Sequence, residues 1–305
     1  LSARRGLAAD AGALVVTRGS QMALALVARA LLRPGDVVAV EAYGYRPAWD
    51  ALRLAGARLV PVPVDGEGLR VDLLESRRHV RAVYVTPHHQ YPTTVGLSAA
   101  RRLRLLELAR ARRMAVLEDD YDHEFHYEGR PVLPLASADR AGVVVYVGTL
   151  SKLLAPGLRI GFAVAPEPLL ARVAALRTLT DRQGDLAVEA AVAELLEDGE
   201  VQRHAGRARR TYQARRDALA AALRAELGGA LSFDLPAGGM ALWACTAPGV
   251  DADAWSARAL ARGVGLHPGR RFAFDGRARG ALRLGFAAHD ERTLREAVRR
   301  MAAAL

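Results

Sequence analysis

The sequence of 305 residues is poor in several residue types. It contains no asparagine, a single isoleucine (Ile160) and a single lysine (Lys152) beside 42 arginines. The codons of Lys, Asn and Ile are rich in A and T, so we expect a GC-rich coding sequence in which few lysines remain. An ammonium group can lose its proton and act as a nucleophile, whereas a guanidinium stays protonated. The retained Lys152 is therefore a candidate for amine chemistry.

Other absences narrow the class of protein. The single cysteine, Cys245, excludes an internal disulfide and favours a reducing cytoplasm. No uncharged apolar run reaches the roughly 18 residues of a membrane helix, and no secretory signal opens the chain. The hydrophobic content of 51% and the charged content of 25% are typical of a globular protein. We expect a cytoplasmic protein without membrane contact.

The formal net charge of +10 would suit a nucleic-acid-binding protein. The densest basic stretch is Arg203–Arg216, which contains Arg207, Arg209, Arg210 and Arg215. Apolar residues run through and beyond it at helical spacing (Ala208, Tyr212, Leu219 and Leu223). This pattern is typical of an amphipathic helix with a solvated basic face, so composition alone does not predict DNA binding.

Short apolar runs alternate with helical patterns over the first half of the chain. We expect strands at Leu14–Thr17, Val37–Val40, Arg58–Val62, Ala82–Thr86, Ala115–Leu117, Val143–Val147 and Ile160–Val164. We expect helices between them at Gln21–Leu32, Arg46–Leu54 and Ser98–Arg112. This alternation predicts an α/β fold with a mainly parallel sheet that is covered on both faces.

After about Pro166 the pattern changes to longer helices and then to short strands. Helices are expected at Pro168–Thr178, Leu186–Leu196, Val201–Leu227, Ala252–Arg262 and Glu291–Ala304, and strands at Leu231–Asp234, Gly238–Cys245 and Ala281–Phe286. We therefore expect a large domain over residues 1–200, trimmed at its N-terminal part. A long linking helix and a small C-terminal α+β domain follow over residues 201–305.

Lys152 lies in the segment 148–162, GTLSKLLAPGLRIGF, where an expected strand leads into a turn with hydroxyls, one amine and one arginine. Such groups suit a phosphate, while the amine is left for imine chemistry. The alternative is an exposed lysine in a loop. The segment resembles the Schiff-base lysine motif of pyridoxal-phosphate enzymes of aminotransferase fold type I. The resemblance implies an αβα sandwich, pyridoxal 5'-phosphate as cofactor, an internal aldimine at Lys152, and phosphate contacts from Thr149, Ser151 and Arg159.

A second motif, 17–21 (TRGSQ), stands between an expected strand and an expected helix. Backbone N–H groups at a helix start favour a phosphate dianion. A Gly-Ser pair there can also be an ordinary helix cap. In the resembled family this turn cradles the phosphate, which implies contacts from Gly19, Ser20 and Gln21.

The acidic run 118–125 (EDDYDHEF) follows an expected strand, at the edge where open α/β sheets bind ligands. The resemblance implies that Asp119 faces the ring nitrogen of the cofactor and that Tyr121 bonds the ring hydroxyl. A metal site is an alternative, with the ligands Asp119, Asp120, Asp122, His123 and His126. That set lacks a recognised spacing, and we expect no metal.

Two more motifs match the family in order. In 41–45 (EAYGY), Tyr45 aligns with the aromatic residue that stacks on the pyridine ring, although core packing of Tyr43 and Tyr45 is the alternative. In 281–286 (ALRLGF), Arg283 aligns with the arginine that holds the substrate α-carboxylate, a task that suits a bidentate guanidinium.

The segment 84–93 (YVTPHHQYPT) resembles the T-P-x-H-Q-(F/Y)-P-(S/T) wording of MocR-type regulators of the GntR class. Ordinary aminotransferases carry an asparagine here that contacts the ring hydroxyl. Since this chain has no asparagine, the contact is missing or is made by His89 or Gln90. The chain also has Thr94 where the family has glycine, and Tyr43 where it has proline.

Two functions follow from the resemblance. The first is the effector-sensing domain of a MocR-type transcriptional regulator, which would bind DNA only through a winged-helix domain that this chain lacks. The second is a working aminotransferase, so enzyme activity stays open. Both functions imply an amino acid or another small amino compound as ligand, and a homodimer.

Overall fold

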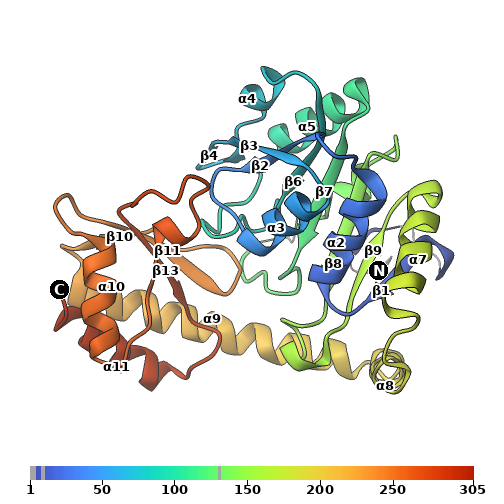
Figure 1. Ribbon diagram of the computed structural model, residues 1–305. Coiled ribbons are helices and arrows are strands. Elements are labelled where there is room, and N and C mark those ends of the chain that lie inside the picture. The colour runs from blue at the N-terminus through green and yellow to red at the C-terminus, as the bar shows by residue number, and fades with distance from the viewer. Residues whose placement is uncertain (1–4, 8–10, 130–131) are drawn as a thin grey trace. The chain divides into compact units, whose positions relative to one another are not determined.

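The computed structural model describes residues 5–7, 11–129 and 132–305 (Figure 1). Arg130 and Pro131, which end the acidic motif region, lie outside the described residues. The chain forms two compact units. The first unit comprises the described residues up to Gln90 together with 95–123 and 132–204, and the second comprises 91–94, 124–129 and 205–305. Among the described residues, no helix is both long and apolar enough to cross a membrane.

The first unit is built on a sheet of seven strands in the order β1-β9-β8-β7-β6-β2-β3. The strands are β1 Leu14–Thr17, β2 Val37–Glu41, β3 Arg58–Val62, β6 Val80–Val85, β7 Ala115–Asp120, β8 Val144–Thr149 and β9 Gly161–Val164. Strands β8, β7, β6, β2 and β3 are parallel, and β9 runs antiparallel to both of its neighbours. The expected mainly parallel α/β sheet is confirmed.

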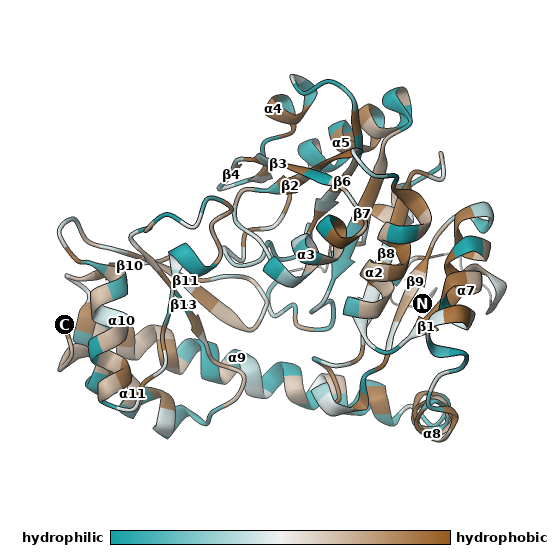
Figure 2. Ribbon diagram, viewed as in Figure 1, coloured by the Kyte–Doolittle hydropathy of each residue, from teal (hydrophilic) through white to brown (hydrophobic). Residues whose placement is uncertain are grey.

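Helices cover both faces of this sheet (Figure 1). They are α2 Ser20–Leu31, α3 Arg46–Leu54, α4 Val71–Glu75, α5 Ala99–Arg112 and α7 Glu167–Asp181. Residues of α4 and α5 pack on one face, against alternate side chains of the central strands. Helix α2 contacts β8 and β9, and α3 contacts β3. In Figure 2 the apolar colouring of β7 precedes its acidic end, Glu118–Asp120, and an apolar stretch of this kind is expected for a strand that is buried on both faces.

Short elements connect these layers. They are a 3-10 helix Ala11–Ala13, the hairpin β4 Val64–Asp65 and β5 Gly68–Leu69, α6 Leu135–Ala138, a 3-10 helix Pro156–Leu158, and α8 Leu186–Glu197. Strands β7 and β8 end at Asp120 and Thr149, so the acidic motif and the lysine segment both begin at the carboxyl ends of parallel strands. The sheet thereby brings the two motifs to the same edge.

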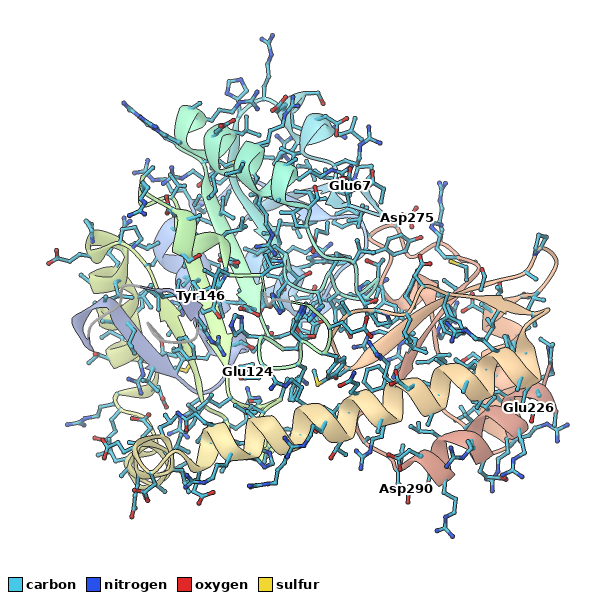
Figure 3. The ribbon with its side chains drawn as sticks, turned by 180° about the vertical axis from the view of Figure 1, so that it is seen from behind. Glu67, Glu124, Tyr146, Glu226, Asp275 and Asp290 are labelled. Atoms are coloured by element: carbon cyan, nitrogen blue, oxygen red, sulfur yellow. The ribbon has the colours of Figure 1, made fainter. Side chains whose placement is uncertain are left out.

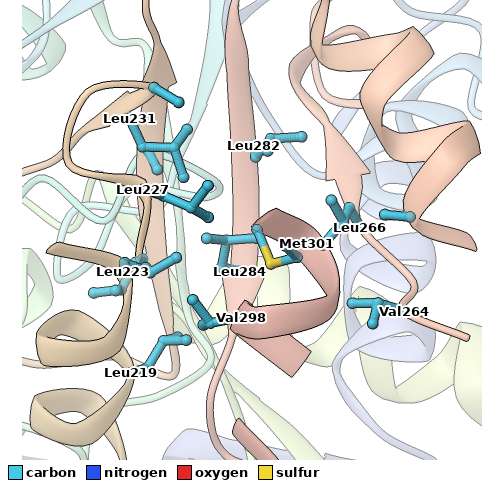
Figure 4. Packing of buried hydrophobic residues seen from close by; sticks show 14 of the residues in the cluster. Leu219, Leu223, Leu227, Leu231, Val264, Leu266, Leu282, Leu284, Val298 and Met301 are labelled. Carbon is cyan, nitrogen blue, oxygen red and sulfur yellow. The ribbon is translucent and has the colours of Figure 1, made fainter. Parts of the chain in front are cut away.

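The second unit holds an antiparallel sheet in the order β10-β11-β13-β12. Its elements are α9 Glu200–Leu227 (which begins within the first unit), β10 Leu231–Ser232, β11 Ala241–Thr246, α10 Ala252–Ala261, β12 His267–Pro268, a 3-10 helix Gly269–Arg271, β13 Ala281–Gly285 and α11 Glu291–Ala302. Leu223 of α9, Leu282 of β13 and Val298 of α11 are buried in one apolar cluster (Figure 4).

The basic stretch on α9 corrects one expectation. Arg207, Arg209 and Arg210 are exposed, as predicted for a solvated face. Arg216, however, is only 2% exposed, because it lies four residues after Tyr212 and therefore on the apolar side of the helix. Its guanidinium donates to the Pro236 carbonyl at 2.6 Å and to Glu128 Oε1 at 2.6 Å. Arg216 thus joins helix α9 to two other segments of the second unit through hydrogen bonds of its buried guanidinium.

Candidate functional site

Asp119 lies near the end of β7 and is 4% exposed. The register of the sheet pairs Tyr84 of β6 with Leu117, which shares a face with Asp119. Tyr84 Oη donates to Asp119 Oδ2 at 2.7 Å. Asp119 Oδ1 is buried and has no hydrogen-bond partner among the described residues. The carboxylate thus has one oxygen fixed and one oxygen left for a ligand.

The pKa of Asp119 depends on its burial and on neighbouring groups. Burial raises the pKa of Asp119 to about 7, while the hydrogen bond from Tyr84 and the positive charge of Lys152 oppose that rise. Lys152 lies in the turn after β8, its side chain is exposed, and no hydrogen bond or ion pair holds its amine within the described part of the chain. Because β7 and β8 are neighbouring parallel strands, the turn that carries Lys152 lies at the same sheet edge as Asp119, and the amine is available for chemistry.

An arginine covers the start of helix α2. The helix has no side-chain cap, and Gly19 precedes it with a φ of 78°. Arg159 Nη2 donates to the Arg18 carbonyl at 3.1 Å, and a Cβ built on Gly19 would lie 2.9 Å from Arg159 Nη2. A Cβ on Gly161 would lie 2.6 Å from the backbone nitrogen of Ser20. The two glycines allow this close approach, which joins a guanidinium to the N–H groups of a helix start.

Hydroxyls of the lysine segment adjoin that helix start, because Thr149 pairs with Gly161 in the sheet. Thr149 Oγ1 donates to the Ile160 carbonyl at 3.1 Å and accepts from the Ser151 N–H at 3.1 Å. Ser151 Oγ is buried and has no partner among the residues described. Gln21 Nε2 donates to the Pro47 carbonyl at 2.8 Å, so this side chain is held by α3.

The residues expected around a cofactor ring lie in the same unit. Tyr121 Oη donates to the His89 carbonyl at 3.1 Å, and His89 Nδ1 lies 2.9 Å from Asp122 Oδ1. Tyr45 is half-buried at the start of α3. Gln90 Nε2 donates to the Tyr43 carbonyl at 2.8 Å and therefore supports the loop that carries Tyr45.

Two buried polar residues of this site, Tyr84 and Glu41, are absent from the sequence-based prediction. Glu41 ends β2 and is 2% exposed. Its Oε2 accepts from Thr86 Oγ1 at 2.8 Å and from Gln90 Nε2 at 3.2 Å. The available signal was a polar side chain at the end of an apolar strand, as at Asp119, and a tyrosine hydroxyl inside the apolar strand β6.

The acidity of Glu41 predicts a pH effect on stability. Burial raises the pKa of Glu41 from 4.5 to about 7, against its hydrogen bonds from Thr86 and Gln90. Between these pH values the folded chain keeps a proton that the unfolded chain releases, so this group lowers stability as pH rises through the window. Glu41→Gln removes that loss. Relative to the wild type, we expect the cofactor-free variant to gain roughly 2–3 kcal/mol of unfolding free energy between pH 4.5 and pH 7.5.

Urea unfolding of both proteins at several pH values measures this gain. Glu67→Gln is the matched control, because the Glu67 side chain is 65% exposed. Glu67 is labelled in Figure 3. We expect little pH-dependent difference for it. A constant offset between Glu41→Gln and the wild type at all pH values would contradict the prediction.

The other acids of the motif are paired within the protein. Asp120 Oδ2 accepts from Tyr146 Oη at 2.8 Å and lies 2.8 Å from His123 Nδ1. Contacts with His123 lower the pKa of Asp120 against the effect of its burial. Together with the His89–Asp122 contact, these pairs give Asp120, Asp122 and His123, three ligands of the alternative metal site, partners inside the fold.

Arg283 lies on β13 in the second unit, between Trp243 of β11 and His267 of β12. Its guanidinium lies over the ring of Tyr91, 4.7 Å from the ring centroid. Arg283 Nε is buried and no described residue accepts a hydrogen bond from it. This cation can bind an anion that the chain itself does not supply.

The first unit therefore fits pyridoxal phosphate by its own chemistry. The unpartnered Ser151 Oγ, the helix start at Ser20 and the Arg159 guanidinium suit a phosphate, and the unpartnered Asp119 Oδ1 suits a protonated ring nitrogen. Lys152 supplies the amine.

Comparisons with known proteins agree with this chemistry. The sequence profile of class I and II aminotransferases matches residues 2–301. Aromatic-amino-acid aminotransferase 1 of Thermococcus litoralis is 34% identical over 95% of this chain and 71% of that protein. The probable rhizopine catabolism regulatory protein MocR of Rhizobium meliloti is 35% identical over 98% of this chain but only 60% of its own length.

A solved structure is similar as well. The alpha-aminoadipate aminotransferase of Thermus thermophilus, in complex with N-(5'-phosphopyridoxyl)-L-leucine, has a TM-score of 0.90 and 34% identity, and the match covers 96% of this chain and 77% of that one. The fold is that of fold type I pyridoxal-phosphate enzymes, and the cofactor is pyridoxal 5'-phosphate. The chain thus belongs to the class I and II aminotransferase family.

Proposed function

We propose that this chain is an aminotransferase-like domain that holds pyridoxal phosphate covalently at Lys152, and that it serves as the effector-sensing part of a MocR-type transcriptional regulator. The observation that supports the cofactor site is that Asp119, near the end of β7, and Lys152, in the turn after the neighbouring parallel strand β8, lie at the same edge of the sheet, and that Asp119 Oδ1 has no partner within the described chain. The phosphate donors adjoin the same strand, β8.

Each side chain then has a task. When bound, the cofactor supplies an aldehyde that captures amines and a ring that withdraws electrons. Asp119 Oδ1 would keep the proton on the ring nitrogen, Tyr121 with His89 or Gln90 would orient the ring hydroxyl, and Tyr45 would stack on the ring. The phosphate is bound by backbone N–H groups of Gly19, Ser20 and Gln21 and by the side chains of Ser20, Thr149, Ser151 and Arg159.

The amino compound is bound by two further groups. Arg283 pairs with its carboxylate through a bidentate contact. The free Lys152 amine would hold and move a proton at the substrate carbon next to the nitrogen. These tasks apply to a sensor and to an enzyme alike, because exchange of one amine for another needs the same residues.

The sequence motif of residues 84–93 and the similarity to MocR favour the function of a transcriptional regulator. The chain spans 60% of that relative, and in our proposal the remaining part of the whole protein carries a winged helix that binds DNA. Amine exchange at Lys152 would then shift a two-state protein between conformations of different DNA affinity. The proposal includes a homodimer in the cytoplasm.

A working aminotransferase is the second candidate, favoured by 34% identity to an aminotransferase over 71% of its length. Turnover separates the two functions. The cofactor-loaded protein is mixed with a panel of L-amino acids and excess 2-oxoglutarate, and product is counted per site. We expect at most one equivalent per site for a sensor. Many equivalents per site would overturn the sensor and establish the enzyme.

A further inference from the structure

Two buried tyrosines on neighbouring strands each donate to a carboxylate of β7. Tyr84 of β6 bonds Asp119 Oδ2 at 2.7 Å, and Tyr146 of β8 bonds Asp120 Oδ2 at 2.8 Å. Successive residues of a strand point to opposite faces of a sheet, so these two pairs lie on opposite faces. Figure 3 shows Tyr146 in the first unit. Asp119 and Asp120, which are adjacent in the sequence, thus each accept a hydrogen bond from one buried tyrosine.

The hydroxyl of Tyr84 is a permanent donor. Tyr84 has no exposed surface, and burial together with the charge of Asp119 raises its pKa well above the ordinary value. A hydrogen bond from a hydroxyl to a carboxylate is of the strong, charge-assisted kind. It stabilises the ionised form of Asp119, whereas burial and the neighbouring acids Asp120 and Asp122 favour the neutral form. It also fixes the rotation of the carboxylate, since Oδ2 is bound and Oδ1 is left.

We propose that Tyr84 is a positioning residue for the cofactor's ring nitrogen: its hydroxyl keeps Asp119 ionised and turned so that Oδ1 is presented to that nitrogen. The proposal rests on the proposed role of Asp119. An ionised Oδ1 accepts the N–H of a protonated ring, whereas a neutral carboxyl group would not hold that proton. Tyr146 supports Asp120, which His123 also contacts, and has no such role toward the ring.

The test compares two ligands that differ at one ring atom. The cofactor-free protein is titrated with pyridoxal phosphate and with its 1-deaza analogue, in which C–H replaces the ring nitrogen, and the ratio of the two affinities is determined. The wild type should prefer pyridoxal phosphate. Tyr84→Phe should reduce that preference about tenfold, as expected for loss of a hydrogen bond to a charged group. Tyr146→Phe is the matched control and should change the preference less than about twofold.

A merely structural role for Tyr84 would weaken the binding of both ligands equally and leave the ratio unchanged, which would overturn the proposal. Equal loss of the preference in Tyr84→Phe and Tyr146→Phe would also overturn it, because the effect would then be general loosening of the sheet. Melting temperatures of the cofactor-free variants show that both are folded. If the wild type bound pyridoxal phosphate and the 1-deaza analogue equally well, the proposed roles of Asp119 and Tyr84 would both be wrong. The covalent role of Lys152 is tested separately by labelling.

Discussion

Lys152→Arg is expected to abolish the visible absorbance that the protein acquires with pyridoxal phosphate. Lys152 carries the only side-chain amine in the sequence, and a guanidinium stays protonated and does not form the covalent link. Absorption spectra before and after borohydride reduction measure the effect. As a control, Arg113→Lys in the Lys152→Arg background restores one lysine at an exposed helix end. We expect no absorbance from that double variant. An undiminished absorbance in Lys152→Arg would contradict the assignment.

Arg159→Met is expected to weaken the binding of pyridoxal phosphate about 100-fold while changing the affinity for pyridoxal little. The guanidinium lies over the first turn of α2, and a hydrogen bond to a charged group contributes roughly 1.5–3 kcal/mol, so loss of a two-bond contact gives an effect of this order. Titration of the cofactor-free protein with each compound measures the two affinities.

Arg18→Met provides the control for Arg159→Met. The Arg18 guanidinium pairs with Asp181 at 2.9 Å, and it is the backbone carbonyl of Arg18, which the substitution keeps, that accepts from Arg159. We expect the control to bind pyridoxal phosphate almost as the wild type does. Equal losses for pyridoxal phosphate and pyridoxal in Arg159→Met would show that this arginine does not bind the phosphate.

The main elements of the fold could be predicted from the sequence. The central strands are apolar runs because both of their faces are buried, and they recur between amphipathic helices. The structure extends several of them, so that β7 includes Asp119 and β8 includes Thr149. The two-residue strand β12 was not predicted, since His267–Pro268 has neither the length nor the alternation of a strand. It pairs there because β13 offers a free edge, which is a tertiary effect.

The sequence names candidate site residues where residue type and motif coincide, as at Lys152, whose role stays a prediction. The residues that hold others in place could not be named in this way, because their roles depend on register between strands. Tyr84 is one such residue, and Glu41 is another. The contact of Gln90 with the cofactor stays a prediction, and its motif gave no signal that its amide also donates to Glu41 and to the Tyr43 carbonyl. Thr94 shows the reverse case, because its φ of 66° explains why the family has glycine there.

Covalent binding of the cofactor at Lys152 is tested most directly by chemical labelling. The protein is incubated with pyridoxal phosphate, reduced with borohydride and cleaved after arginine, and the peptides are weighed and sequenced by mass spectrometry. We predict one modified peptide, containing Lys152 with the added mass of a reduced phosphopyridoxyl group. An unmodified Lys152 peptide from protein that has bound the cofactor would contradict the claim.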